Sequence, residues 1–283
     1  MCLNQDLQDL RIYRIMVFDL LSESRFARFK RVKIKNLLFI IFLILFTAVF
    51  SPQVLAEEKA PHWSYGGAAN PTKWSQISTE FAMCELGRDQ SPINIDDAVQ
   101  GTPINIEFNY KPTPLSVVNN GHTVQVNYKS GSTININGEK YELLQFHFHT
   151  PSEHTISGKA SALELHLVHR NGKGQLAVVG VMMAKGTTNP LIEQIWKHIP
   201  AAGKNNIVQN STISAANLLP KNKAYFSYTG SLTTPPCSES VKWNVLAEPI
   251  QVSEEQIEAF QNLYQVNARP VQPINGRRIE FHG

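Results

Sequence analysis

Histidines in two short segments, residues 144–154 and 164–169, are the side chains of this sequence whose types and spacing best suit chemistry. If the first segment is a β-strand, alternate side chains share a face, so His147 and His149 point the same way. A second strand carrying His166 would place a third imidazole beside them. Three neutral ring nitrogens that converge on one point leave a fourth tetrahedral position open, which is typical of a catalytic zinc site rather than a structural one.

Two polar residues strengthen the interpretation of these histidines as metal ligands. Glu164 lies two positions before His166, and Gln145 lies two positions before His147, so each shares a strand face with its histidine. Metal-bound imidazoles usually donate their second ring N–H to such a neighbour, which fixes the orientation of the ring. A single histidine on a strand is more often an ordinary core or surface residue, so it is the whole group that predicts a metal site.

The beginning of the chain has the pattern of an export signal. Residues 25–35 are densely basic, residues 37–50 are almost wholly apolar, and small residues follow as far as Ala56. This order predicts a secretory signal peptide over residues 1–56, with Met16 as an alternative start. The other interpretation is an uncleaved membrane anchor, although the apolar run is shorter than the about 20 residues that a membrane span needs.

Length and composition describe the remainder of the chain. Of the 283 residues of the whole chain, 42% are hydrophobic and 17% are charged, which suits one globular domain with a sizeable core. We expect residues 57–283 to form a single exported domain, in the periplasm or outside the cell, with no stable membrane span. The net positive charge of residues 1–56, the leader, is larger than the net charge of +3 of the whole chain. The domain that follows is therefore slightly acidic. Nucleic-acid binding is therefore not expected.

The cysteines point to the same compartment. Cys2 lies in the leader, which leaves Cys84 and Cys237 as a pair in the domain. An even number of cysteines in an exported protein predicts a disulfide, whereas two free buried thiols would be the alternative. Because Cys237 directly follows residues 233–236, the bond would also hold that segment in place.

Strand-like segments separated by turn residues recur along the domain. Short connections between residues 123 and 183 favour antiparallel neighbours. Asn189 followed by Pro190 predicts one helix start, and a capping box of Ser253 and Gln256 predicts another. The expected fold is mostly β (all-β or α+β), a single domain with a large, mainly antiparallel, twisted central sheet and a few short peripheral helices. The strands are expected at residues 104–110, 123–128, 133–137, 141–149, 162–169, 175–183, 224–228 and 241–246.

Seven short motifs, in the same order along the chain, resemble those of the α-class carbonic anhydrases. The resemblance covers nearly all of residues 62–282, and the export signal and cysteine pair are similar to those of the bacterial periplasmic members. The motifs are His-Trp-Ser-Tyr at 62–65, Gln-Ser-Pro-Ile-Asn-Ile at 90–95, Asn-Asn-Gly-His at 119–122, Gln-Phe-His-Phe-His at 145–149, Ser-Glu-His at 152–154, Glu-Leu-His-Leu-Val-His at 164–169 and Ser-Leu-Thr-Thr-Pro-Pro at 231–236.

The resemblance implies a lyase that reversibly hydrates CO2 to bicarbonate and a proton, by attack of hydroxide bound to Zn²⁺. It assigns His147, His149 and His166 as the metal ligands and gives each a partner for its second ring nitrogen. The partners are Gln145 for His147, Glu164 for His166 and the backbone of Asn267 for His149. Neutral ligands suit this chemistry because they leave the charge of zinc undiminished, whereas a carboxylate ligand would raise the pKa of the bound water.

Further site residues are implied by the resemblance. Thr233 is expected to donate its hydroxyl proton to Glu153 and to accept a hydrogen bond from the hydroxide, with Thr234 contacting bicarbonate from the other side. CO2 has no charge or net dipole, so an apolar wall is expected beside the metal. The wall residues are Val168, Val178, Leu232 and Trp243, of which Val168 also shares strand parity with His166.

Protons must leave the site, and histidine suits this task because its pKa lies near neutrality. The resemblance gives the role of proton shuttle to His122 and assigns Tyr65 and Asn120 to ordering the connecting waters. His154 is expected to form a hydrogen bond within the core. His169 has the opposite strand parity from the ligand on its own segment, so it should not reach the metal.

Two rival functions remain open at this point. His147, His149 and Glu153 match part of the cupin signature, in which the glutamate is also a ligand and the metal is Fe or Mn. The flanking glycines of that signature are missing, and the segment at Thr233 would be unexplained. The other rival is a catalytically inactive, zinc-binding family member. Such relatives typically lose a ligand histidine, and this chain keeps all three.

The sequence also departs from the animal members of the family. The connections at residues 157–161 and 171–175 look short, and Arg170 stands where an aromatic residue is common. These differences leave the shape of the cavity rim and the selectivity for inhibitors open. The resemblance allows a homodimer without deciding for it.

Overall fold

The computed structural model describes residues 61–283, so the signal peptide expected over residues 1–56 lies outside the described residues. The described residues form one compact unit. Within residues 61–283, no helix is both long and apolar enough to cross a membrane.

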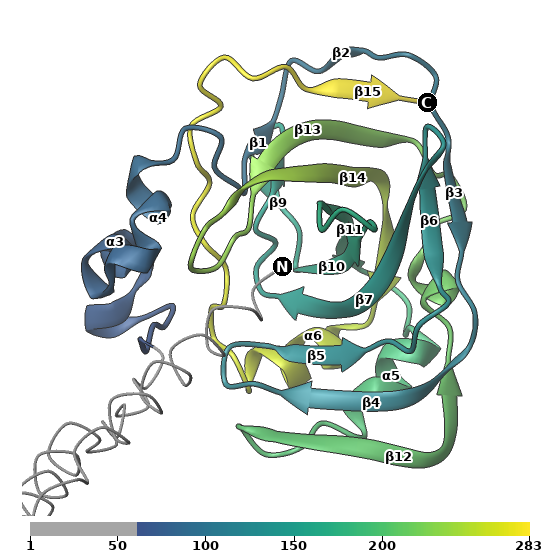
Figure 1. The fold of residues 1–283 in the computed structure, drawn as a ribbon. Coiled ribbons are helices and arrows are strands. Elements are labelled where there is room, and N and C mark those ends of the chain that lie inside the picture. Colours follow the sequence, from purple (N-terminus) through teal and green to yellow (C-terminus); the bar gives the residue numbers. More distant parts are fainter. Residues whose placement is uncertain (1–60) are drawn as a thin grey trace, which may run out of the picture. The chain divides into compact units, whose positions relative to one another are not determined.

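Most of this unit is one large mixed sheet, whose strands follow one another from β12 at the bottom of Figure 1 to β2 at the top. Neighbouring strands are antiparallel except for two parallel pairs, β11 with β14 and β15 with β2. The order is β12 (Lys204–Ile213), β4 (Thr113–Asn119), β5 (Val124–Asn127), β7 (Glu139–His149), β10 (Leu163–Arg170), β11 (Leu176–Lys185), β14 (Glu239–Val252), β13 (Tyr225–Ser231), β15 (Glu280–His282) and β2 (Val99–Gln100).

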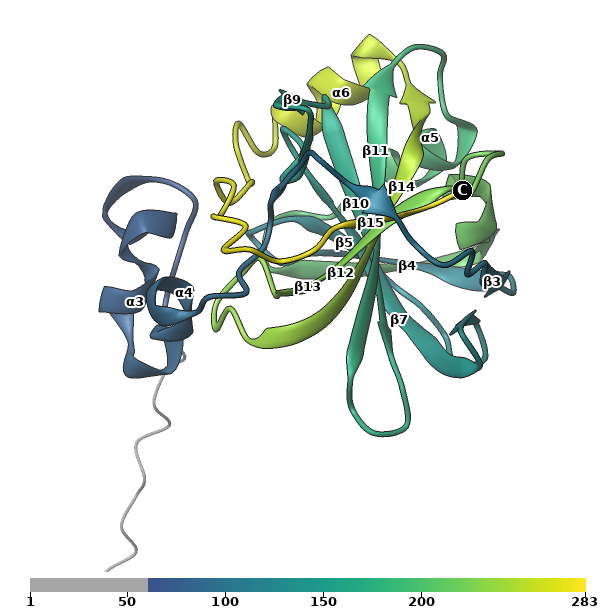
Figure 2. The same ribbon diagram turned by 90° about the horizontal axis from the view of Figure 1, so that it is seen from above.

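Smaller strands complete the sheet structure of the described residues. β6 pairs with both β7 and β3, and a separate small sheet joins three short strands. These elements are β3 (Ile106–Asn109), β6 (Thr133–Ile136), β1 (Asn94–Ile95), β8 (Thr155–Ile156) and β9 (Lys159–Ala160). In Figure 2 the strands fan out across one another, as the right-handed twist of neighbouring strands requires. The expected fold class, mostly β with a mainly antiparallel twisted sheet, is confirmed.

A bulge in β7 determines which face its histidines occupy. Before the bulge the odd-numbered Tyr141 and Leu143 are buried in the main core, and after it the even-numbered Phe146 and Phe148 are. The register shifts in the pairing of β7 with β10, where Leu144 has no partner of its own. One extra residue switches the alternation of faces. The residues after Leu144 with odd numbers therefore point away from the main core.

Two helices cover the core side of this part of the sheet. α5 (Pro190–Trp196) begins at Asn189, and α6 (Glu254–Gln261) begins with the expected capping box, so both predicted helix starts are confirmed. Their apolar side chains belong to the main core, and the ring of Phe148 contacts Trp196 at a centroid distance of 4.7 Å. The helices therefore support β7 from the face opposite its histidines.

Short helical turns, which the sequence did not indicate, lie mainly before the first strand. They are η2 (Gly67–Ala69), η3 (Pro71–Lys73), α3 (Trp74–Ile77), η4 (Thr79–Phe81) and α4 (Met83–Leu86), and η5 (Ala215–Leu218) follows β12. Each is too short to show a helical periodicity of apolar residues, which is why pattern reasoning misses it.

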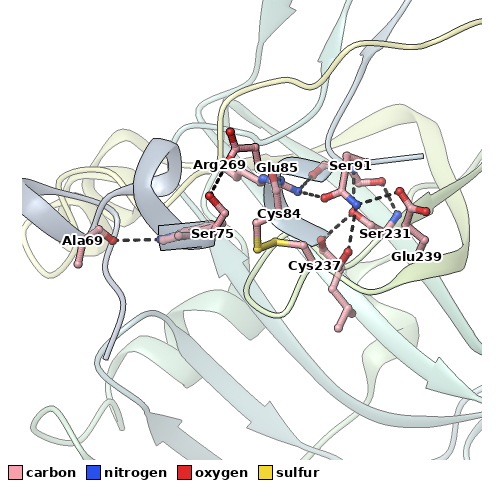
Figure 3. Close-up of a disulfide and its surroundings, with 12 residues drawn as sticks. Ala69, Ser75, Cys84, Glu85, Ser91, Ser231, Cys237, Glu239 and Arg269 are labelled. Carbon is pink, nitrogen blue, oxygen red and sulfur yellow. Dashed lines mark hydrogen bonds between the residues drawn. A yellow bond between two sulfur atoms is a disulfide. The ribbon is translucent and has the colours of Figure 1, made fainter. Parts of the chain in front are cut away.

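A disulfide joins α4 to the segment that follows Thr233, which confirms the predicted pair of Cys84 and Cys237 (Figure 3). Both cysteines are buried in a small apolar cluster with Trp74 and Phe81. Disulfides are typical of proteins in oxidising compartments.

Candidate metal centre and active site

Three histidines converge on the face of the sheet opposite the main core. In the antiparallel pairing of β7 with β10, His166 lies directly across from His147, and His149 lies across from Glu164. The ring centroids of His147, His149 and His166 are 4.5 to 5.3 Å apart. One ring nitrogen from each lies within 4.8 Å of the other two, which is close enough for a single ion to bind all three.

The second nitrogen of each ring contacts a hydrogen-bond acceptor. The distances are 2.9 Å from His147 Nδ1 to Gln145 Oε1, 2.7 Å from His149 Nδ1 to the Asn267 carbonyl, and 2.9 Å from His166 Nε2 to Glu164 Oε1. An acceptor at one ring nitrogen fixes the proton there and leaves a lone pair on the other. The lone pairs of His147 Nε2, His149 Nε2 and His166 Nδ1 are therefore available to a metal.

One of these nitrogens lacks a partner that a metal ion could supply. His149 Nε2 is fully buried and has no hydrogen-bond partner among residues 61–283. Buried polar atoms are rarely left unpaired, because the lost hydration is costly. A metal ion at the three histidines would satisfy this nitrogen, and three imidazoles with an open fourth position suit zinc.

Burial keeps the three imidazoles neutral. It lowers the pKa of His149 to about 4 and lowers the pKa of His147 and His166 as well, with the neighbouring rings adding to the effect at His147. A protonated histidine cannot bind a metal, so a lowered pKa keeps the ligands ready at neutral pH.

Glu164 is a buried carboxylate that holds several groups at once. Its Oε1 contacts His166 and also His154 Nδ1 at 2.8 Å, while its Oε2 accepts hydrogen bonds from the backbone N–H groups of Glu153 and His154, each at 2.8 Å. Burial alone would raise the pKa of Glu164, but its hydrogen-bonded contacts with His154 and His166 outweigh burial and hold the pKa well below its usual range. The carboxylate stays charged and fixes the orientation of His166.

The close approach of Glu164 to the sheet depends on a glycine. Gly180 in β11 pairs with His166, and a Cβ built at Gly180 would lie 3.1 Å from Glu164 Oε1. A larger residue there would displace the carboxylate. His154 completes the chain of contacts, because its Nε2 lies 2.7 Å from the Tyr228 hydroxyl, as expected of a core hydrogen bond.

Glu153 and Thr233 lie near the histidines but are not bonded to each other. Glu153 Oε1 accepts a hydrogen bond from the Arg269 backbone N–H at 2.8 Å, and Oε2 lies 3.8 Å from His166 Nδ1. That Oε2 is buried without a hydrogen bond among the described residues, although the Thr233 hydroxyl is close enough to favour the charged carboxylate. Burial raises the pKa of Glu153 to about 7 against the opposing effects of His166, the Arg269 amide and Thr233.

The expected apolar wall lies beside the third histidine. Val168 pairs with Val178 across β10 and β11, and Val178 pairs with Trp243 across β11 and β14. Val178 and Trp243 are buried in a second apolar cluster, against which Val168 and Leu232 pack. The Trp243 ring lies 4.8 Å from the ring of His166. Thr234 is half-buried in the segment after β13.

His122 occupies the turn between β4 and β5. The side chain of Asn120 shapes this turn, because its Oδ1 accepts the backbone N–H groups of His122 and Thr123, each at 2.9 Å. The His122 ring stacks on Trp63 with centroids 3.8 Å apart and planes 9° from parallel. Burial, and then the charge of His62, lowers the pKa of His122.

Tyr65 belongs to the same aromatic group, with its ring 5.5 Å from that of Trp63. Burial raises the pKa of Tyr65 well above its usual value, and the negative charge of Glu153 adds to the effect. His169 points into the main core instead, where its Nε2 lies 2.8 Å from the Tyr110 hydroxyl, so it is separate from the metal centre as expected.

Two features of the site were missed by sequence reasoning. One is the stacking of Trp63 on His122, although Trp63 lies within one of the motifs. The other is Gln125, which pairs with His147 across β5 and β7. Strand alternation could have indicated Gln125, because it is flanked by the buried Val124 and Val126 and so faces the side of the histidines.

Comparison with known proteins assigns the chain to a family of enzymes. A family model described as eukaryotic-type carbonic anhydrase matches residues 69–283. The chain therefore belongs to this family, the α-class carbonic anhydrases, as the motifs predicted.

Individual relatives are similar over most of the chain. A carbonic anhydrase from a Nostoc species is 44% identical over 230 residues, which are 79% of this chain and 87% of the relative. A hyperthermostable carbonic anhydrase from an active hydrothermal vent chimney has a TM-score of 0.77 at 47% identity, covering 78% of this chain and 100% of that one. The α-carbonic anhydrase of Thermovibrio ammonificans, solved with the inhibitor sulfanilamide, has a TM-score of 0.76 at 41% identity, with 78% and 100% covered.

Proposed function

We propose that this protein catalyses the reversible hydration of CO2 to bicarbonate and a proton, with one Zn²⁺ held by His147, His149 and His166. The observation that carries the proposal is the convergence of three unprotonated ring nitrogens, one of them buried and unpaired among residues 61–283. Membership of the carbonic anhydrase family supports CO2 as the substrate.

When bound, zinc lowers the pKa of a coordinated water to about 7 and so supplies hydroxide near neutral pH, an effect for which carbonic anhydrase itself is the reference case. The protein's part is to hold the ligands neutral and fixed. An oxygen of Gln145, Asn267 or Glu164 accepts a hydrogen bond from the ring N–H of each ligand, which prevents that ring from turning.

In this proposal, Thr233 and Glu153 orient the reacting oxygen. The Thr233 hydroxyl would donate a hydrogen bond to the unpaired Oε2 of Glu153, and Thr233 Oγ1 could then only accept a hydrogen bond. Glu153 acts as this hydrogen-bond acceptor in its charged form, and a cation at His166 would favour that carboxylate form. Thr234 would contact the product from the other side of the site.

The apolar side chains of Val168, Val178, Leu232 and Trp243 suit CO2 because the molecule has no charge or net dipole. Since water gains little from such a wall, CO2 can occupy the place without displacing strongly bound water. Bicarbonate is charged and gains nothing from the same wall, so the wall favours its release.

His122 is proposed to take up the proton that each turnover releases, through waters ordered by Tyr65 and Asn120. A group with a pKa near 7 gives its proton to bulk water at only about 10³–10⁴ per second, whereas carbonic anhydrases reach about 10⁶ per second, so a relay to buffer is required. The half-buried ring of His122, at the edge of the histidine face, is suited to that relay.

The test is stopped-flow CO2 hydration with the purified protein, comparing the wild type with His149→Ala and measuring zinc in both. Rapid hydration that requires stoichiometric zinc and is lost with the ligand would support the proposal. His198→Ala, a histidine change after α5, is the matched control and should leave hydration unchanged. Stoichiometric zinc without hydration would point to the inactive zinc-binding role, and iron or manganese in place of zinc would point to the cupin-like one.

We also infer that the protein acts outside the cytoplasm, in the periplasm or beyond it, after removal of residues 1–56. The disulfide between Cys84 and Cys237 supports an oxidising compartment. Fractionation of cells, with mass determination of the N-terminus of the mature protein, tests both parts of the inference.

A further inference from the structure

An exposed histidine lies next to the proposed proton shuttle. The ring centroids of His62 and His122 are 6.4 Å apart, with the ring planes at 45°. Burial lowers the pKa of His122, and a charge on His62 lowers it further. His62 is exposed to solvent, whereas His122 is half-buried and has one face covered by the ring of Trp63.

The segment that carries His62 is held firmly to the domain. The Trp63 ring packs edge to face against Trp74, with centroids 5.2 Å apart. Trp74 is completely buried, and its indole N–H lies 2.9 Å from the Ser64 carbonyl and 3.1 Å from the Ala69 carbonyl. These contacts fix the position of His62 relative to His122, so the short separation of the two rings is a property of the fold.

We propose that His62 is a second proton-relay residue, which receives the proton that His122 has collected and passes it to a buffer base in the solvent. This inference rests on the proposed role of His122. In the transfer, one N–H bond of protonated His122 breaks and one forms on His62, through a bridging water that donates one proton as it accepts another. His62 then loses its proton to the buffer, and both imidazoles return to the neutral state.

Chemistry and access both favour this relay. Imidazoles titrate near neutrality, so one can accept a proton from another with little free-energy cost. A centroid distance of 6.4 Å suits transfer through a water rather than direct contact. Among residues 61–283, neither His62 nor His122 forms an ion pair with a carboxylate that would hold the proton. The exposed ring offers buffer molecules an approach that the covered face of His122 does not.

The experiment measures kcat and kcat/KM for CO2 hydration at low and at high buffer concentration. The variants are His62→Ala, His122→Ala and the double variant, with His198→Ala as the matched control. For His62→Ala we expect kcat at low buffer to fall by about twofold to fivefold, less than the roughly 10²-fold typical of losing a general acid–base group. Added imidazole or high buffer should restore it, and kcat/KM should stay unchanged because proton release follows CO2 conversion.

The double variant distinguishes a relay in series from two independent routes. If the proton passes through His122 first, removing His62 as well should slow the enzyme no further than His122→Ala alone. A multiplicative loss in the double variant would overturn the proposal. So would a His62→Ala enzyme as fast as the wild type at low buffer, and in that case a slow His122→Ala enzyme would leave the shuttle itself intact. If His122→Ala also had no effect, the shuttle role would fail together with the relay.

Discussion

At the scale of single residues, Asn267 contacts both His149, a proposed metal ligand, and His122, the proposed proton shuttle. Its backbone carbonyl contacts His149 Nδ1, and its side-chain Nδ2 donates to the carbonyl oxygens of His122 at 3.1 Å and Phe148 at 2.9 Å. Its Oδ1 accepts the backbone N–H of Thr150 at 2.7 Å. Because Asn267 is completely buried, none of these bonds competes with water.

Asn267→Ala separates the two functions of this residue. The variant keeps the backbone carbonyl, so we expect it to bind zinc, but the turn of His122 loses its anchor. Unpaired buried backbone groups should destabilise the protein by about 1–3 kcal/mol. The kcat for CO2 hydration at low buffer should fall while kcat/KM stays near the wild-type value. Zinc content, urea unfolding and stopped-flow kinetics check these points, and loss of zinc would contradict the assignment.

Local pattern accounts for only part of this site. His147 and His149 could be placed on one face because strand alternation is a local rule, and Glu164 could be joined to His166 for the same reason. Asn267 is remote in sequence from His149, so only the family resemblance indicated its backbone contact. The side-chain bonds of Asn267 and the stacking of Trp63 on His122 depend on tertiary packing, which no local pattern encodes.

At the scale of elements, a bulge changes which residues of β7 face the core. The strand was predicted at residues 141–149, but a strict alternation along it would put Tyr141 and His147 on the same face. The bulge at Leu144 prevents this, because Tyr141 belongs to the core while His147 lies on the opposite face beside His149 and His166. A bulge has no dependable sequence signal, so the strand could be predicted and its change of face could not.

The starts of α5 and α6 are joined by a single side chain, that of Gln256. Its Oε1 accepts the backbone N–H of Ser253 at 3.1 Å and that of Asn189 at 2.9 Å, and its Nε2 donates to the Asn189 carbonyl at 2.7 Å. The capping box of α6 was predicted from the sequence. Its link to α5 was not, since the two helices meet only in the folded protein.

Gln256→Ala should therefore destabilise the protein more than Ser253→Ala does. Loss of the serine removes one cap, worth about 1 kcal/mol, whereas loss of the glutamine frees backbone groups at two helices and should cost about 2–3 kcal/mol. Urea unfolding of both variants measures the difference. CO2 hydration should be unchanged, because the helices pack on the face opposite the histidines. Equal costs for the two variants would show that the bonds to Asn189 add nothing.

At the scale of the whole molecule, Arg269 joins parts of the chain that are far apart in sequence. Its guanidinium donates to the carbonyls of Cys84 and Ser91 and to Gln90 Oε1, at 2.7 to 2.9 Å, while its backbone N–H holds Glu153. Burial lowers its pKa to about 10, so it remains charged at neutral pH. Figure 3 shows Arg269 beside the disulfide. The disulfide could be predicted by counting cysteines, whereas this buried cation has no comparable signal.

Stability of the whole domain in acid should depend on His169. The ring is completely buried between the Tyr110 hydroxyl and the Ala177 carbonyl, and burial lowers its pKa to about 3. The unfolded chain, in which a histidine has a pKa of about 6.5, takes up the proton first as the pH falls. The contribution of neutral, buried His169 to the free energy of unfolding is therefore fully present above about pH 6.5. It is lost progressively toward about pH 3, by roughly 4–5 kcal/mol in all.

His169→Gln isolates this contribution, because glutamine can bond the same two partners without titrating. We expect the variant to be less stable than the wild type at neutral pH and to lose stability more slowly between about pH 6 and pH 4, by one proton's worth of slope, about 1.4 kcal/mol per pH unit. Urea unfolding at a series of pH values measures both slopes. The other buried histidines are present in both proteins, so their contributions to the pH dependence of unfolding cancel in the comparison. Parallel curves would show that His169 is already protonated in the folded protein, and that its burial does not govern the acid limit of the fold.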